Sequence, residues 1–243
     1  NREEIDKWLL SKYNKLLKYV TESYDEYDLN KVVKAVTNFV SDDLSNWYIR
    51  RNRNRFWGSE LNDSKKSVYI TTYEVLKGLS LMIAPIVPFL SEELYQNLTG
   101  EYSVHTADFP EYDNSLINES IEEKMDLVRN LISIGRNVRE EVKIKVREPL
   151  SEVLLDGKTE NILGDLTELI KEELNVKNVM FVKDLSEYMN FNVKPNFKEV
   201  GKVFGPKIKF FQEELAKLNS EEISKLRNEE TLHMNIDGED TKV

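Results

Sequence analysis

The spacing of apolar residues changes near residue 142, and this change limits the possible folds more than any other feature of the sequence. Before it, apolar residues recur at steps of three and four, the period of an amphipathic helix. After it, short segments alternate between apolar and polar residues, as half-exposed strands do. The pattern predicts a mainly α fold, in which a helical bundle over residues 1–142 precedes a small α/β domain over residues 143–243.

Capping and breaking residues mark the expected helices of the first part. The first helix has one apolar face, formed by Ile5, Trp8, Leu9, Tyr13, Leu16, Leu17 and Val20. Asp28 is a suitable N-cap for the next helix, whose apolar stripe we expect to comprise Leu29, Val33, Val36, Val40 and Trp47. Pro85 and Pro88 predict a kink or stop in the long helix over residues 67–90. The last helix of this part should run to about Val142.

The second part begins with three apolar residues that alternate with three basic ones. Val142, Ile144 and Val146 predict a strand, and the alternation would place Lys143, Lys145 and Arg147 together on its other face. Beyond this segment we expect strands at 153–156, 176–183 and 191–193, and helices at 161–174, 197–204 and 207–218.

Composition excludes several classes of site. The chain has no cysteine, so disulfides and thiolate metal sites are ruled out, and neither of its two histidines has the spacing of a metal pair or a catalytic triad. We therefore expect no catalytic and no metal-binding residues. The longest apolar run, residues 79–90, is too short to span a bilayer. We therefore expect a cytoplasmic protein that does not bind a membrane. A start without Met and a polar end suggest a truncated piece of a larger protein.

One segment concentrates positive charge and aromatic rings in a chain of net charge -10. Residues 47–57 hold four arginines, four aromatic side chains and no acid. Arginine pairs with phosphate and stacks on bases, and aromatic rings stack on unpaired bases. The segment therefore predicts an RNA-binding site whose candidate residues are Arg50, Arg51, Arg53, Arg55, Trp57 and Trp47.

Structural roles compete with this interpretation. Trp47 and Tyr48 lie near the apolar stripe and are suited to the core, and the arginines can pair with Asp42, Asp43 or the acids of another helix. Lys143, Lys145 and Arg147 are candidates for phosphate contacts, although a solvated strand face explains them equally well. A later group of lysines, at positions 194, 198, 202, 207 and 209, has the same two interpretations. Arg129 and Arg136 share a helix face, but nearby acids can explain them, so we leave both out of the predicted site.

Several segments, taken in order, resemble the anticodon-binding domain of isoleucyl-tRNA synthetases. LSNWYIRRNRNRFW at 44–57 resembles that family's signature helix, and MIAPIVPFLSEELY at 82–95 resembles its proline-kinked helix pair. SVHTADFP at 103–110, KVREPL at 145–150, and NVKPNF at 192–197 with Gly201 and Gly205 resemble later family segments. The likeness covers nearly the whole chain.

The resemblance implies part of a class I ligase that uses ATP and Mg²⁺ to join isoleucine to its tRNA. The family's two nucleotide-binding signatures do not occur in this sequence, so this piece should bind tRNA without a cofactor of its own and without activity alone. The implied partners are an isoleucine tRNA and the rest of the synthetase chain, and we expect a monomer. Two alternatives stay open: the same domain from a valyl or leucyl enzyme, and a helical protein–protein scaffold, because Trp, Tyr and Arg also dominate interface hot spots.

Overall fold

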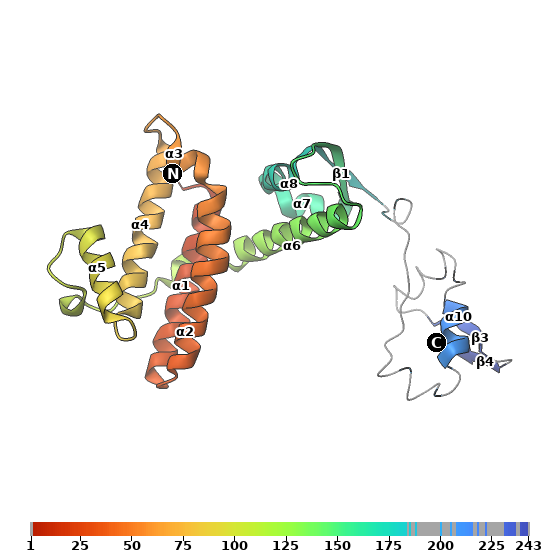
Figure 1. Cartoon of the computed structure of the whole chain (residues 1–243), viewed down its shortest axis with the longest axis horizontal. Coiled ribbons are helices and arrows are strands. Elements are labelled where there is room, and N and C mark those ends of the chain that lie inside the picture. Colours follow the sequence, from red (N-terminus) through yellow and green to blue (C-terminus); the bar gives the residue numbers. More distant parts are fainter. Residues whose placement is uncertain are drawn as a thin grey trace. The chain divides into compact units, whose positions relative to one another are not determined.

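The computed structural model describes residues 2–183, 185, 188, 200, 205, 208–215, 218, 222, 231–236 and 239–242 (Figure 1). The chain divides into two compact units, one of Asn1–Lys145 with Glu168–Ile170 and one of Val146–Thr167 with Lys171–Val243. The fold is mainly α with a small α/β part, as the sequence predicts. The domain boundary expected after residue 142 stays a prediction.

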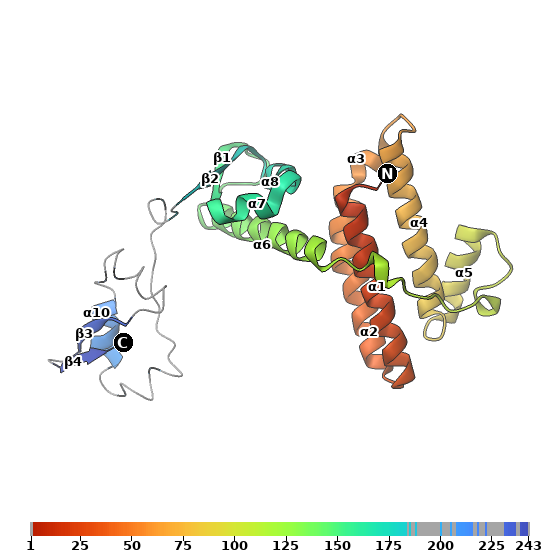
Figure 2. The same ribbon diagram turned by 180° about the vertical axis from the view of Figure 1, so that it is seen from behind.

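The first unit is built around one long helix, α1. This helix packs against α2, the π-helix η1, α4 and α6 (Figure 2). Its predicted apolar face is confirmed, because all seven expected residues are buried. The elements of this unit, in order, are α1 Glu4–Asp25, α2 Leu29–Asn38, η1 Phe39–Ile49, α3 Arg53–Trp57, α4 Asp63–Ile83, α5 Pro88–Thr99, the 3₁₀ turns η2 Val104–Thr106 and η3 Asn114–Leu116, and α6 Glu119–Glu141.

The expected helix boundaries agree with the structure where capping and proline chemistry define them. The Asp28 carboxylate accepts a hydrogen bond from the Lys31 N–H at 3.1 Å and caps α2. Helix α4 ends at Ile83, two residues before Pro85, which has no N–H to continue the helical hydrogen bonds. Pro88 is the first residue of α5, where its missing N–H costs nothing. Gly100 ends α5 with φ at +72°.

The predicted face of the second helix is wrong. Leu29, Val33 and Val40 are exposed, whereas Val32, Phe39, Leu44 and Tyr48 are buried together with the expected Val36 and Trp47. Adjacent valines at 32 and 33 offer two apolar faces, and packing against α1 selects the first. Beyond residue 39 the chain is a π-helix, in which each turn takes more residues than an α-helix turn. An α-helical projection therefore loses its register there.

The predicted strand at 142–147 is also wrong, because this segment ends helix α6. Lys143 has φ at +58° and donates its N–H to the Glu140 carbonyl, while Ile144 donates to the Arg139 carbonyl. These two bonds are the Schellman motif, which satisfies the last carbonyls of a helix. Arg139 Nη1 donates to the Lys145 carbonyl at 3.0 Å. Helix capping, and not a strand ladder, therefore uses the backbone of this segment.

The second unit contains a parallel strand pair, and its expected strands at 153–156 and 176–183 are confirmed. Strand β1, Leu150–Asp156, pairs with β2, Val176–Val182. Parallel neighbours need a crossover connection, and the chain between them forms η4 Gly157–Thr159, α7 Glu160–Leu163, η5 Gly164–Leu166 and α8 Thr167–Leu174. Near the C-terminus, α10 Ile208–Leu215 lies against β3 His233–Ile236, which pairs antiparallel with β4 Glu239–Lys242.

Several expectations for the C-terminal region fall outside the described residues. The strand expected at 191–193 lies there entirely, and so does nearly all of the helix expected at 197–204. Helix α10 confirms the central part of the helix expected at 207–218, and its Phe211 and Leu215 form a small core with Met234. Across the described ranges, no helix combines the length and the apolar character that a bilayer crossing requires.

Candidate nucleic-acid interface

A cavity of about 480 Å³ lies between η1 and α6. Asp42, Asn46 and Arg50 reach it from η1 at four-residue steps, so one face of that helix lines it. On the opposite side α6 presents residues at steps of three and four, which again places them on one helix face. The full lining set is Asp42, Asn46, Trp47, Arg50, Arg129, Ile132, Ser133, Arg136 and Asn137.

Arg129 connects the two walls of this cavity. Its Nη1 donates to the Asp43 carboxylate at 2.6 Å, across a sequence separation of 86 residues. Its guanidinium carbon also lies 5.8 Å from the Trp8 ring centroid and 5.6 Å from that of Trp47, within the range of cation–π attraction. Asp43 therefore pairs with Arg129, which the predicted site leaves out.

Arg50 and Arg51 follow directly after η1, which ends at Ile49. Arg50 caps η1, and its Nε donates to the Asn46 carbonyl at 2.8 Å. Both arginines are half-buried, and the Nε of Arg51 lies below the surface. Arg50 lines the cavity together with Arg129 and Arg136, so three cationic side chains from two helices meet there.

The two candidate tryptophans occupy opposite environments. Trp47 is 6% exposed, and its indole N–H points to the Met125 sulfur at 3.3 Å, so this side chain belongs to the core and forms part of the cavity wall. Trp57, at the end of α3, is 75% exposed. Only the Trp57 ring is open enough for a base to stack fully on its face.

All of the donors of Arg55 are occupied. A guanidinium group has five N–H donors. In Arg55, Nε donates to Ser64 Oγ, Nη1 donates to Asp6 and to the Asn52 side chain, and Nη2 donates to Asp6 and to the Ser64 carbonyl, at 2.8–2.9 Å. This geometry leaves Arg55 no N–H for phosphate, and it favours a structural role over the expected RNA contact.

Asp6, the partner of Arg55, is fully buried on α1. Besides the two-pronged contact with Arg55, its carboxylate accepts bonds from the Tyr48 hydroxyl and the Ser67 hydroxyl, both at 2.7 Å, and from the Glu3 N–H. Burial alone would raise the pKa of Asp6, but the hydrogen bonds from Arg55, Ser67 and Tyr48 outweigh it and hold the pKa below its ordinary value. Burial, together with the Asp6 charge, raises the pKa of Tyr48.

The three basic residues at 143, 145 and 147 do not lie on a strand that would place their side chains on one face. Lys143, Lys145 and Arg147 are all exposed, but they occupy a helix C-cap and a following turn. The division between the two compact units falls between Lys145 and Val146. The alternation that was expected to place these three side chains on one face is therefore absent. Of the later lysine group, only Lys209 lies within the described residues, and it is exposed on α10.

Sequence reasoning missed most of the cavity. Arg129 and Arg136 were seen to share a helix face, and that spacing was the available signal, but nothing in the sequence placed α6 opposite η1. Asp6 gave no signal, because it is a single acid on a helix whose apolar face explained its neighbours. Of the expected residues, the structure brings Trp47 and Arg50 to the cavity, and places Arg53 and Trp57 on the separate, exposed helix α3.

The three arginines that line the cavity of this helical bundle favour an anionic ligand, as a nucleic-acid-binding domain requires. The family of the anticodon-binding domain of tRNA ligase matches residues 6–154, and the chain belongs to this family. The match includes the bundle from Asp6 to the end of α6 and every residue that lines the cavity.

The curated relatives narrow the comparison to one kind of ligase. The chain is 40% identical over 240 residues to an isoleucine–tRNA ligase of Clostridium kluyveri, covering 96% of this chain and 23% of the relative. It is 41% identical over 247 residues to that of Clostridium novyi, covering 98% and 23%, and 39% identical over 245 residues to that of Treponema denticola, covering 98% and 22%. The chain thus spans less than a quarter of the length of these relatives.

Proposed function

We propose that this chain recognises the anticodon of an isoleucine-accepting tRNA as one part of an isoleucine–tRNA ligase. The relatives supply the choice of isoleucine. The observation that carries the proposal is the cavity between η1 and α6, where three arginines meet in a chain of net charge -10. Sequence-specific RNA recognition usually targets unpaired loop bases, and a tRNA anticodon is such a loop.

In this proposal the cavity accepts one unpaired base. Its volume of about 480 Å³ is in the range of small-ligand sites. Arg129, which is packed on the buried Trp47 ring, offers one planar wall, Asp42 and Asn46 offer hydrogen-bonding groups to the base edge, and Arg50 and Arg136 balance phosphate charge.

The remaining contacts lie outside the cavity. Arg53 and Trp57 on α3 take a phosphate and a second base, and Arg51 adds a phosphate contact. Lys143, Lys145 and Arg147 provide further backbone contacts that position the RNA without reading its sequence. Arg55 is not in this set, since its donors are occupied.

The complete ligase performs the chemistry in this proposal. ATP and Mg²⁺ serve its other parts, whereas this piece binds no cofactor and is inactive alone. Its partners are the tRNA and the rest of the synthetase chain. We propose further that it acts as a monomer in the cytoplasm.

A gel-shift comparison tests the function. The 243-residue chain is mixed at moderate salt with isoleucine, valine and leucine tRNAs, and with an isoleucine tRNA whose anticodon has been substituted. We expect a preference for the unaltered isoleucine tRNA. A preference for valine or leucine tRNA would favour the same domain of another ligase, and absence of binding to every tRNA would favour a protein–protein scaffold.

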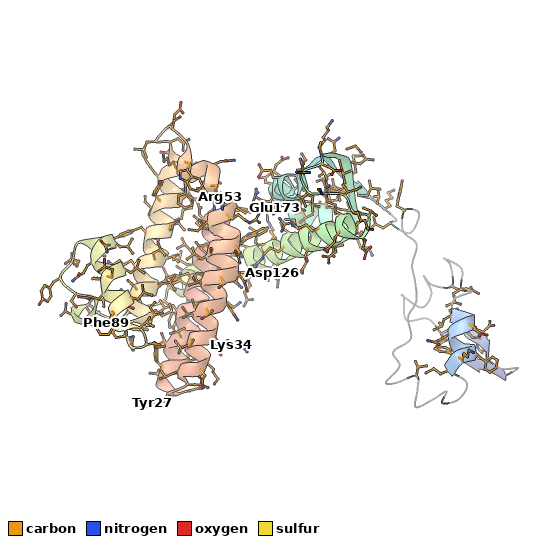
Figure 3. The ribbon with its side chains drawn as sticks, viewed as in Figure 1. Tyr27, Lys34, Arg53, Phe89, Asp126 and Glu173 are labelled. Atoms are coloured by element: carbon orange, nitrogen blue, oxygen red, sulfur yellow. The ribbon has the colours of Figure 1, made fainter. Side chains whose placement is uncertain are left out.

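Variants assign the contacts. Arg53→Ala should weaken binding because it removes a contact on α3, and Arg136→Ala should weaken it because it removes a contact in the cavity. Lys34→Ala is the matched control, because Lys34 is exposed on α2 toward the opposite end of the bundle from Arg53 (Figure 3). An equal loss in all three variants would mean that any cation on this unit contributes, and would refute a defined site.

A further inference from the structure

Helix α3 carries two of the proposed RNA contacts but has little to hold it in place. It has five residues, and none of them is buried. A helix this short is not stable by itself in water. Arg53 and Trp57 are exposed, so their side chains contribute no anchoring to a core. The position of α3 must come from a few specific contacts with other elements.

Most of these contacts converge on Arg55, the central residue of α3. Its guanidinium joins α3 to α1 through Asp6, to the end of the preceding helical segment through Asn52, and to the start of α4 through Ser64. A second, outer set joins α3 to α4: the Phe56 ring meets the Tyr69 ring edge-on at 5.3 Å, the Tyr69 hydroxyl donates to the Phe56 carbonyl at 3.2 Å, and Lys65 Nζ donates to the Gly58 carbonyl.

Asp6 determines where the Arg55 side chain can lie. Its two oxygens accept from both Nη atoms at 2.8 Å, a fork that fixes the plane of the guanidinium as well as its distance. Tyr48 and Ser67 hold the carboxylate from two further elements, η1 and α4. The carboxylate therefore cannot follow α3 if α3 moves.

We propose that Asp6 is a positioning residue for RNA binding, which acts through Arg55 to fix α3 and thereby the placement of Arg53 and Trp57. This inference rests on the proposed function and adds a residue that touches no RNA. Removal of the Asp6 charge should leave the bundle folded and release α3, because the helices on either side have buried faces of their own.

The test uses the whole chain labelled with 5-fluorotryptophan. Its three tryptophans give separate ¹⁹F signals: Trp8 and Trp47 report on the core, and Trp57 reports on α3. In Asp6→Asn we expect the Trp57 signal alone to sharpen and move toward its unfolded position. Asp28→Asn is the matched control, since Asp28 is a half-buried N-cap of α2 whose role asparagine also fills.

Binding of the anticodon stem-loop RNA of an isoleucine tRNA is measured on the same proteins. We expect Asp6→Asn to lower affinity roughly tenfold, about the effect of losing one stacked base, and Asp28→Asn to leave it unchanged. In the Asp6→Asn background, Trp57→Ala should cost much less affinity than in the wild type, because the contact is already lost. A purely structural defect would instead disturb the Trp8 and Trp47 signals.

The milder variant Ser64→Ala covers the case in which Asp6→Asn does not fold. It removes the hydroxyl that accepts from Arg55 Nε and donates to Glu3 but keeps the Asp6 contacts, and it should shift the Trp57 signal and the affinity in the same direction by less. An unchanged Trp57 signal with wild-type affinity in the folded variant would overturn the positioning role. Failure of the wild-type chain itself to bind the stem-loop would instead overturn the proposed function.

Discussion

Replacing Trp47 or Trp57 by alanine should separate stability from RNA binding. Trp47 is 6% exposed, lies under Arg129 and donates to Met125, so its loss leaves a cavity in the core. Such truncations cost about 3–5 kcal/mol, a large part of the roughly 5–15 kcal/mol that holds a domain folded. Trp57 is 75% exposed, so Trp57→Ala should change the free energy of unfolding by less than about 0.5 kcal/mol.

The RNA affinities should change in a different pattern. A stacked base contributes about 1–3 kcal/mol, so Trp57→Ala should weaken binding of the isoleucine anticodon stem-loop by about 5- to 150-fold. Urea denaturation followed by fluorescence measures stability in both variants, because the buried Trp8 remains as a reporter of the first unit. Equal destabilisation by the two substitutions, or full RNA affinity in Trp57→Ala, would refute this division between a core indole and a surface indole.

Three further predictions concern acid stability, packing and salt. The lowered pKa of Asp6 means that its ion pair with Arg55 stabilises the fold at neutral pH, and this contribution is lost as pH falls below about 4; the urea midpoint of the wild type should drop there, and that of Asp6→Asn should drop less. Gly78→Ala should lower the free energy of unfolding by about 1–3 kcal/mol in urea denaturation despite the better helix propensity of alanine, because the new Cβ would overlap the Tyr13 hydroxyl. Arg136→Ala should weaken stem-loop binding and reduce the slope of log affinity against log salt by about one, as measured by a salt titration.

Sequence periodicity predicted the helices well where one apolar face was unambiguous. Helix α1 has a single such face, and each of its expected core residues is buried. Helix α2 has adjacent valines, so two faces were equally apolar and only the packing partner could choose between them. The segment that follows is a π-helix, and the α-helical period used to project its side chains does not apply to it. Different side chains therefore face the core.

The candidate site was only partly predictable, because composition indicates residue types but not their partners. The arginine-rich segment, which the sequence predicts to bind RNA, contains residues of different environment, from the exposed Trp57 to the buried Trp47, and its RNA contacts stay a prediction. The opposing wall on α6 and the enclosed Asp6 are tertiary features, separated from their partners by tens of residues along the chain. Alternation at 142–147 was misleading, because the same residues can close a helix with a Schellman motif.

The contrast between Arg53 and Arg55 suggests how an acidic chain can present an exposed positive charge on α3. Two residues apart on a helix, their side chains leave roughly opposite sides, so one reaches Asp6 while the other stays exposed. Asp6 is enclosed by its donors, and Arg55 neutralises its negative charge inside the bundle. Had Asp6 been at the surface, it would have been free to pair with Arg53 or to repel phosphate. Burying the acid with one arginine therefore both anchors α3 and leaves its outer face positive.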